Sequence, residues 1–283
     1  MLFYLGELLK EFFGPARLLQ SYTVLITLAL YSSFFLVNKL LPKFYNILPQ
    51  DRGREFTISA EAAKGKPTGS GIVFITIFAI MCILFVPMGL LQYGILLLTW
   101  LTMLTGFLDD HSVTSWGEYK KGILDLAIAV MLAITVINFN GTTIKLISLD
   151  MTITLPPVLY GILAVILVWV SINVTNCADG VDGLSGTLVL IALITLGIVF
   201  YFILGHKDIA AYLLVPHLKD GAKWAVMTFA LAGTLMGYLW HNAFPSSVLM
   251  GDAGSRALGF FIGVCVIITR NPLIFIATST IML

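Results

Sequence analysis

Apolar residues occur along this chain in long blocks, separated by short polar segments. The eight longest blocks cover residues 21–41, 72–91, 93–108, 122–138, 158–174, 187–204, 224–240 and 257–269, and a ninth begins after Pro272. An α-helix needs roughly 17–25 predominantly apolar residues to cross the hydrocarbon core of a bilayer. The pattern therefore predicts an all-α fold, a polytopic transmembrane helical bundle with eight to nine spans.

The segment before the first block, residues 1–20, mixes Glu7, Lys10 and Glu11 with large apolar side chains. This pattern predicts an amphipathic helix that lies at the membrane interface and ends near Gly14 and Pro15. No linker or low-complexity tract interrupts the chain, so we expect one integral membrane domain over residues 1–283.

The composition agrees with a membrane protein, because 59% of the 283 residues are hydrophobic and only 11% are charged. A formal net charge of +1 excludes a polyelectrolyte partner, so no nucleic acid is expected. The three cysteines are far apart, which argues against a disulfide framework or a zinc site. Cys82 and Cys265 lie in apolar blocks and are expected to be buried as small hydrophobic residues.

If every block crosses the membrane, the loops 42–71, 109–121, 175–186 and 241–256 share one side. Five Lys or Arg residues within 42–71 make this side the cytoplasmic one by the positive-inside tendency. Ten of the 15 carboxylates also fall there: Asp51, Glu55, Glu61, Asp109, Asp110, Glu118, Asp125, Asp179, Asp182 and Asp252. Charges at the ends of spans are costly unless they are paired or bound to a cation, so we expect the chemistry on this face.

The first polar cluster is the glycine-rich segment 64–71, which leads directly into a span. Its backbone amides, together with Lys66 and Thr68, could bind phosphate. The spacing differs from that of a P-loop, and a turn with anchoring cations explains the segment equally well.

The second cluster is the adjacent pair Asp109 and Asp110 at the end of a span. Their mutual repulsion is relieved by a divalent cation or by protonation of one carboxylate, which suits magnesium binding or general-base chemistry. Lys120 and Lys121 begin the next span and could bind phosphate or extend toward the interface.

The third cluster places Asn173, Asn176, Asp179 and Asp182 at intervals of three residues. Gly180 and Gly183 indicate that the helix ends here in a tight turn. Amides and carboxylates together suit recognition of a polar ring, a sugar or a hydrated magnesium ion.

In the fourth cluster, Asp252 lies between glycines and is followed by Ser255, immediately before a span. A carboxylate beside flexible backbone and a helix N-terminus suits a site for a metal ion and phosphate. Asp252 or Ser255 could also cap the helix, and the two roles are compatible.

Four motifs in this order resemble the polyprenyl-phosphate N-acetylhexosamine-1-phosphate transferase superfamily over essentially the whole chain. They are KPT at 66–68, FLDD at 107–110, NCADGVDGL at 176–184 and MGDAGS at 250–255. The run from Phe244 to Gly259 and the segment 13–20 are most similar to the branch that makes the first lipid-linked peptidoglycan precursor. The resemblance implies ten spans, so we expect this chain to lack the final loop and span.

The resemblance implies magnesium-dependent transfer of phospho-N-acetylmuramoyl-pentapeptide from its UDP-linked precursor to undecaprenyl phosphate, which gives lipid I and UMP. It implies a multi-pass protein of the bacterial plasma membrane with its active site on the cytoplasmic face. We expect Asp252 to be the main magnesium ligand, Asp110 to assist it, and Asp109 to act as base or orienting group. The remaining expected substrate-binding residues are Lys66, Thr68, Lys120, Lys121, Asn173, Asn176, Asp179, Asp182 and Ser255.

Other interpretations remain open from the sequence. A sibling enzyme would transfer UDP-N-acetylglucosamine phosphate to a polyprenyl phosphate, and the absent final loop is the feature that would separate the two. A transporter would instead place charges near the membrane midplane and show paired repeats. Glycines at 233, 237, 259 and 263 have the x-x-x spacing that packs helices within one chain or, as in a homodimer, between chains.

Overall fold

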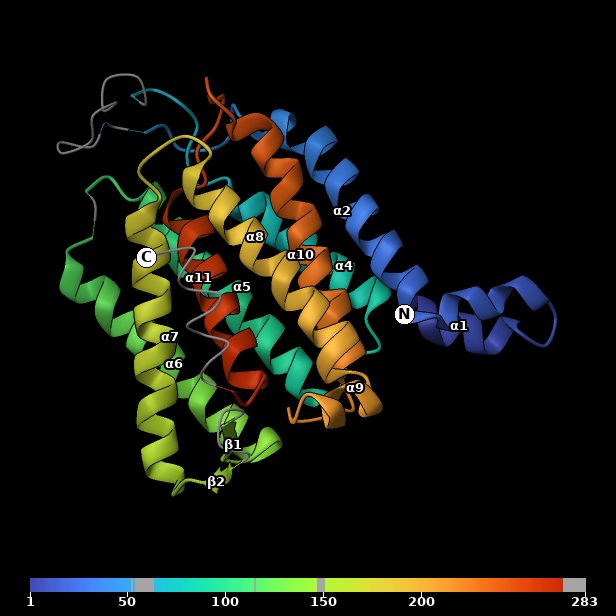
Figure 1. The fold of residues 1–283 in the computed structure, drawn as a ribbon. Coiled ribbons are helices and arrows are strands. Elements are labelled where there is room, and N and C mark those ends of the chain that lie inside the picture. The colour runs from blue at the N-terminus through green and yellow to red at the C-terminus, as the bar shows by residue number, and fades with distance from the viewer. Residues whose placement is uncertain (52, 54–63, 115, 147–150, 272–283) are drawn as a thin grey trace.

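The computed structural model describes residues 1–51, 53, 64–114, 116–146 and 151–271 of the chain. Long helices form a bundle, and a two-stranded antiparallel hairpin lies at one end of it (Figure 1). The elements are α1 (Leu2–Leu9), η1 (Gly14–Gln20), α2 (Tyr22–Phe44), α4 (Gly71–Phe85), α5 (Leu90–His111), α6 (Glu118–Asn140), β1 (Thr143–Leu146), β2 (Met151–Thr154), α7 (Pro157–Ala178), α8 (Leu184–Ile198), η3 (Val199–Leu204), α9 (Lys207–Tyr212), α10 (Gly221–Asn242) and α11 (Gly251–Ile268).

Each of the eight apolar blocks corresponds to a helix, which confirms the polytopic helical membrane bundle. Among the described residues, six helices are long and apolar enough to cross a membrane: α2, α5, α6, α7, α8 with η3, and α11. The apolar helix α4 is shorter, with 15 residues. The ninth expected block, after Pro272, lies outside the described residues.

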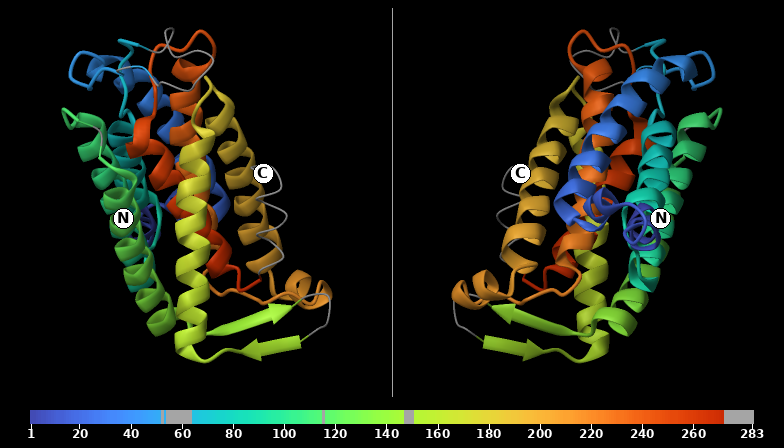
Figure 2. Two further views of the ribbon diagram at one scale, coloured as in Figure 1. Left: turned by 90° about the vertical axis from the view of Figure 1, so that its left-hand side faces the viewer. Right: turned by 90° about the vertical axis from the view of Figure 1, so that its right-hand side faces the viewer.

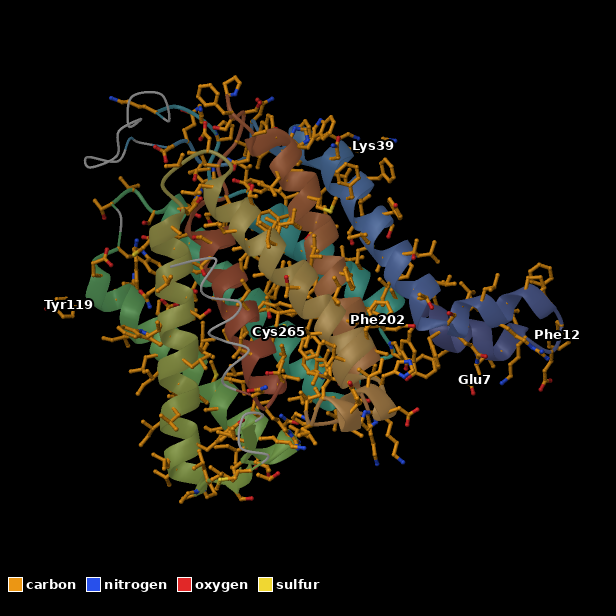
Figure 3. The ribbon with its side chains drawn as sticks, in the orientation of Figure 1. Glu7, Phe12, Lys39, Tyr119, Phe202 and Cys265 are labelled. Carbon is orange, nitrogen blue, oxygen red and sulfur yellow. The ribbon has the colours of Figure 1, made fainter. Side chains whose placement is uncertain are left out.

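The outer helices expose apolar side chains that only a lipid environment accommodates. Only 33% of the most apolar stretch of α7 is buried, whereas 94% of that of α11 is buried. Tyr119 and, on the N-terminal segment, Phe12 project away from the bundle (Figure 3), and Phe202 is also exposed. So much exposed apolar surface on long helices identifies the sides of the bundle as the lipid-facing surface.

Helix α11 lies at the centre, packed against α4, α5 and α7 (Figure 1). Close contact at its N-terminus depends on glycine. A Cβ atom at Gly106 of α5 would lie 2.4 Å from the carbonyl oxygen of Asp252, and one at Gly71 of α4 would lie 2.1 Å from the amide nitrogen of Gly254. Both distances are far below van der Waals contact, so these glycines bring the start of α11 against two neighbouring helices.

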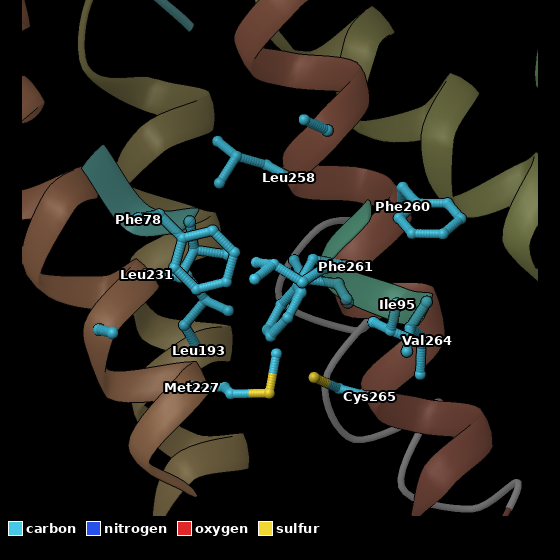
Figure 4. Packing of buried hydrophobic residues seen from close by; sticks show 14 of the residues in the cluster. Phe78, Ile95, Leu193, Met227, Leu231, Leu258, Phe260, Phe261, Val264 and Cys265 are labelled. Carbon is cyan, nitrogen blue, oxygen red and sulfur yellow. The ribbon is translucent and has the colours of Figure 1, made fainter. Parts of the chain in front are cut away.

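Below this contact, aromatic and aliphatic side chains fill the interior (Figure 4). The rings of Phe78 and Phe261 meet edge to face with centroids 5.4 Å apart, a geometry that aromatic pairs favour. Cys82 and Cys265 are fully buried, as expected from their apolar surroundings.

The glycine spacing noted in the sequence serves packing within the chain. Gly233 and Gly237 of α10 contact the backbone of α2, and Gly259 and Gly263 of α11 contact α7. The small residues therefore let helices approach one another closely, as in other membrane bundles.

The N-terminal segment differs from the expectation of one helix ending near Gly14 and Pro15. Helix α1 ends at Leu9, and a second, 3₁₀-helical segment begins at Gly14 with Pro15 in its first turn. Proline fits the first turn of a helix because its missing N–H would have no partner there. The two segments pack on each other beside the start of α2 (Figure 1).

The two ends of the bundle differ in character (Figure 2). One end carries the β1–β2 hairpin and α9, and the other carries the connections before α4, α6, α8 and α11. The hairpin was not predicted from the sequence, because its strands have only four residues each. The four polar clusters all belong to the other end.

Candidate active site

All four polar clusters contribute residues to a cavity of about 400 Å³ at the end of the bundle opposite the hairpin. The second and fourth clusters line it. The third cluster contributes Asn176, and the first contributes Thr68. Its lining residues are Gln50, Asp51, Gly53, Thr68, Asp109, Asp110, Ser112, Lys121, Asn176 and Asp252. The expected gathering of polar clusters on one face is therefore confirmed.

Lys121 lies between two carboxylates at the centre of this cavity. Its Nζ atom is 2.8 Å from Oδ2 of Asp109 and 2.9 Å from Oδ2 of Asp252. The other oxygen of Asp109 accepts a 2.6 Å hydrogen bond from the amide of Trp116. The sequence pattern does not distinguish Lys120 from Lys121, and the structure brings Lys121 into the cavity.

Asn176 connects the end of α7 to the start of α11. Its Nδ2 atom donates to Oδ1 of Asp252 at 3.0 Å and lies 2.9 Å from Oγ of Ser255. Ser255 is itself buried and donates to the carbonyl oxygen of Gly251. Asp252 is thus oriented from both sides, by Asn176 and by Lys121.

Asp110 caps the N-terminus of α11. Its two carboxylate oxygens accept 3.0 Å hydrogen bonds from the amides of Asp252 and Ala253. Gly251 adopts a φ of 67°, and a Cβ atom there would lie 2.5 Å from the Asp110 carboxylate. The sequence left open that Asp252 or Ser255 caps this helix, and the structure instead satisfies the free amides with a carboxylate from α5.

A second ion pair lies one helical turn deeper, between α6 and α11. Arg256 donates to Asp125 at 2.5 Å, and both side chains are 2% exposed. Lys121 and Asp125 are four residues apart on α6, as are Asp252 and Arg256 on α11, so each pair of positions lies on one helix face. Two ion pairs therefore join these helices beside the cavity. In one pair the cation belongs to α6, and in the other it belongs to α11.

Lys66 belongs to a neighbouring polar group rather than to the cavity lining. Its Nζ atom donates to Oγ of Ser246 at 2.9 Å and lies 3.6 Å from the Asp182 carboxylate. Asp182 also accepts from the amide of Ser246 at 3.2 Å. This group joins the first, third and fourth clusters.

The backbone of the glycine-rich segment is engaged in structural hydrogen bonds. The amides of Thr68, Ser70 and Gly71 donate to the carbonyl oxygens of Pro49, Leu249 and Met250. These amides are consequently not available to bind phosphate, which favours the interpretation of the segment as a turn. The side chain of Thr68 still lines the cavity.

Six expected site residues lie outside the cavity lining: Lys66 and Asp182 of the neighbouring polar group, the buried Ser255, and Lys120, Asn173 and Asp179. Lys120 places its ammonium 3.5 Å from the centre of the Trp116 ring. Asn173 donates to the carbonyl oxygen of Trp169 in the preceding turn of its own helix. Asp179 follows the end of α7, where the chain turns as predicted.

Gln50, Gly53 and Ser112 were not predicted as site residues, and Asp51 was predicted only to lie on the same face as the site. Gln50 pairs with Pro67 in an antiparallel bridge that closes the segment between α2 and α4 and brings Asp51 to the cavity. An adjoining hollow of about 630 Å³ shares Gln50 and Asp51 and also includes His111. The basic residues expected at 52 and 54 lie outside the described residues.

The lining of the cavity is strongly acidic. Among the described residues that form it, Asp51, Asp109, Asp110 and Asp252 carry four formal negative charges and Lys121 carries one positive charge. No three His, Cys, Asp or Glu side chains in the described ranges converge as a metal-binding group. An excess of carboxylates with few protein ligands fits a hydrated magnesium ion that is also bound by phosphate oxygens.

Comparisons with known proteins agree with this arrangement. The sequence model described as "Glycosyl transferase family 4" matches residues 92–270. A protein named phospho-N-acetylmuramoyl-pentapeptide-transferase from Treponema pallidum (strain Nichols) is 51% identical over 278 residues, which are 97% of this chain and 77% of the relative. Proteins of the same name from Aquifex aeolicus (strain VF5) and Helicobacter pylori (strain HPAG1) are each 30% identical, over 97% and 98% of this chain and 80% and 82% of the relatives.

Proposed function

Since the chain belongs to glycosyl transferase family 4, and within it to the phospho-N-acetylmuramoyl-pentapeptide-transferases of peptidoglycan synthesis, we propose that it transfers phospho-N-acetylmuramoyl-pentapeptide from its UDP-linked precursor to undecaprenyl phosphate. An oxygen of the lipid phosphate forms a bond to the phosphorus attached to the sugar. The bond between that phosphorus and the bridging oxygen breaks, and UMP leaves with this oxygen. The products are lipid I and UMP. The observation that carries the proposal is the Asp109–Lys121–Asp252 arrangement at one end of a membrane bundle.

The reaction brings two anions together, so neutralisation of charge is the main task of the site. Lys121 is the cation at the centre of the cavity and is assigned to phosphate. The excess of carboxylates around it supports a magnesium requirement. Asp252 would hold this magnesium, with Asp110 nearby, and the ion would neutralise the diphosphate of the donor.

Asp109 is assigned to the lipid phosphate. Its carboxylate is buried, faces the cavity and is held by Trp116 and Lys121. A carboxylate fixed in this way can accept a proton from the incoming phosphate or orient it. Because phosphate is already largely ionised near neutral pH, orientation is the larger contribution.

Recognition of the soluble donor is assigned to the third cluster and its neighbours. Asn176 faces the cavity beside Asp252, and Asp182 lies with Lys66 next to it. The adjoining hollow at Gln50 and Asp51 offers room beside the reacting phosphates. Thr68 contributes a hydroxyl to the lining.

The position at one end of the bundle suits a reaction between a soluble and a membrane-bound substrate. We assign this end to the cytoplasmic face of the plasma membrane, because the UDP-linked donor is soluble and the 42–71 segment is rich in Lys and Arg. Charges that gather at this end also argue against the transporter interpretation.

The direct test is an assay of the purified, detergent-solubilised chain with undecaprenyl phosphate and UDP-N-acetylmuramoyl-pentapeptide, with and without magnesium. We expect UMP release that depends on magnesium and on both substrates. Release from UDP-N-acetylglucosamine in its place would move the chain to the sibling activity. UMP release at an unchanged rate in the presence of a chelator would contradict the metal assignment.

Lys121 and Lys120 form a matched pair for testing which lysine serves the reaction. Lys121→Gln is expected to lower kcat for UMP release roughly 100-fold or more, because a preorganised charge is removed from the developing anion. Lys120→Gln should stay within about threefold of the parent chain, since Lys120 rests on an aromatic ring outside the cavity. Equal losses in both variants would refute this assignment.

A further inference from the structure

A second polar cavity lies at the opposite end of the bundle, near the β1–β2 hairpin. It has a volume of about 590 Å³ and is formed where α5 and α10 begin and where α6 and α11 end. Its polar lining includes Gln92, Asn140, Lys219 and Arg270. None of these residues belongs to the candidate active site.

Three of the lining residues carry buried N–H groups without a hydrogen-bond partner in the described part of the chain. Gln92 is 1% exposed; its Oε1 accepts from the amide of Gly89 at 3.0 Å, and its Nε2 remains unpaired. The Oδ1 of Asn140 accepts from Arg270 at 2.8 Å, and its Nδ2 remains unpaired. The Nε of Arg270 is also buried and unpaired.

The unpaired buried atoms of this cavity are all hydrogen-bond donors. The side-chain orientations of all three are fixed by bonds through other atoms, and no buried side-chain acceptor among the described lining residues lacks a partner. An unpaired buried donor is costly, so the cavity is suited to a group that offers several acceptor oxygens. Arg270 and Lys219 add positive charge, whereas the carboxylate of Asp220 is already paired with Lys223 at 2.9 Å.

We propose that this cavity binds the phosphate of an anionic phospholipid headgroup in the membrane leaflet opposite the active site. A phosphate presents several charged acceptors, which match the unpaired donors on three residues of the same lining. The walls favour a lipid over a free anion, because Leu90 and Phe139 line the same cavity with largely exposed apolar side chains. The position at the ends of membrane-crossing helices places the donors where headgroups occur.

The site can be tested with substitutions that keep the shape and reverse the hydrogen-bonding character. Asn140→Asp retains the oxygen that accepts from Arg270 and replaces the free donor by an acceptor. Gln92→Glu does the same while retaining the oxygen that accepts from Gly89. Asn138→Asp is the matched control, because it adds the same charge to an exposed position on the same helix outside the cavity.

Binding of phosphatidylglycerol and phosphatidylcholine to the purified chain would be measured by native mass spectrometry in detergent, with inorganic phosphate as competitor. We expect the parent chain and Asn138→Asp to retain one phosphatidylglycerol in preference to phosphatidylcholine. Asn140→Asp and Gln92→Glu should each bind phosphatidylglycerol roughly tenfold more weakly.

Two outcomes would overturn the proposal. Equal retention of phosphatidylglycerol by all four proteins would show that these donors do not bind the headgroup. Complete displacement of the lipid by millimolar inorganic phosphate would assign the cavity to a soluble anion. Melting temperatures of the four proteins without added lipid would verify that each variant is folded.

Discussion

Asp252→Asn is expected to lower the rate of UMP release roughly 100- to 1000-fold, the range observed when one preorganised electrostatic group is removed from an active site. The amide keeps an oxygen for the Asn176 hydrogen bond, so the fold should be retained. It loses the charge that faces Lys121 and that is assigned to magnesium. The measurement is UMP release over a series of magnesium concentrations.

Asp208→Asn is the control for this experiment, because it makes the same change on the exposed helix α9. It should leave both the rate and the magnesium dependence unchanged. If the enzyme with Asn at 252 retained the parent rate and magnesium profile, the assignment of Asp252 as metal ligand would be wrong. A fall in rate accompanied by a fall in melting temperature would instead indicate a structural role.

The second large effect is expected at the buried ion pair between α6 and α11. Asp125→Leu leaves the charge of Arg256 buried without its partner and should destabilise the bundle by roughly 3–5 kcal/mol. The Nε and Nη1 atoms of Arg256 already lack partners among the described residues, so no second acceptor compensates. Thermal unfolding in detergent would measure the loss.

A double variant distinguishes a charge effect from a packing effect. Asp125→Leu combined with Arg256→Met removes both charges, and such replacements of buried pairs are often neutral or stabilising. We expect the double variant to recover most of the stability lost in Asp125→Leu. A double variant as unstable as the single one would show that the volume at this position, and not the charge, is decisive.

The ion pair also bears on how α6 and α11 are aligned. Each helix carries one positive and one negative side chain, one turn apart. On α6 these are Lys121 and Asp125, and on α11 they are Arg256 and Asp252. A shift of α11 by one turn would bring like charges together, Lys121 with Arg256 or Asp125 with Asp252. The two pairs therefore favour the single alignment in which Asp252 reaches the cavity.

Much of the fold was predictable because the bilayer imposes a simple rule on the sequence. Every backbone polar group must be paired within the membrane, so long apolar blocks become helices, and all eight described blocks did. Block ends were less predictable. The last described helix begins at Gly251, six residues before the apolar block at 257–269, because Asp110 caps its polar first turn.

The candidate site was predictable as a set of residues and only partly as an arrangement. Asp109, Asp110, Asn176 and Asp252 were identified from their position at span ends, and all line the cavity. Periodicity could not decide between Lys120 and Lys121, because adjacent residues on a helix differ by only about 100° and both begin the same span. Packing against α11 turns Lys121 inward and leaves Lys120 on Trp116.

The sequence by itself determined the membrane bundle, the face on which its chemistry gathers and the family to which it belongs, since these depend on the order of apolar blocks and short motifs. Tertiary structure alone decided that Lys121 joins Asp109 to Asp252, that Asp110 caps α11, and that Arg256 is buried on Asp125. It also brought Gln92, Asn140 and Arg270 together at the far end. These contacts join helices distant in sequence, and their geometry is set by how closely glycines such as Gly106 let the helices approach.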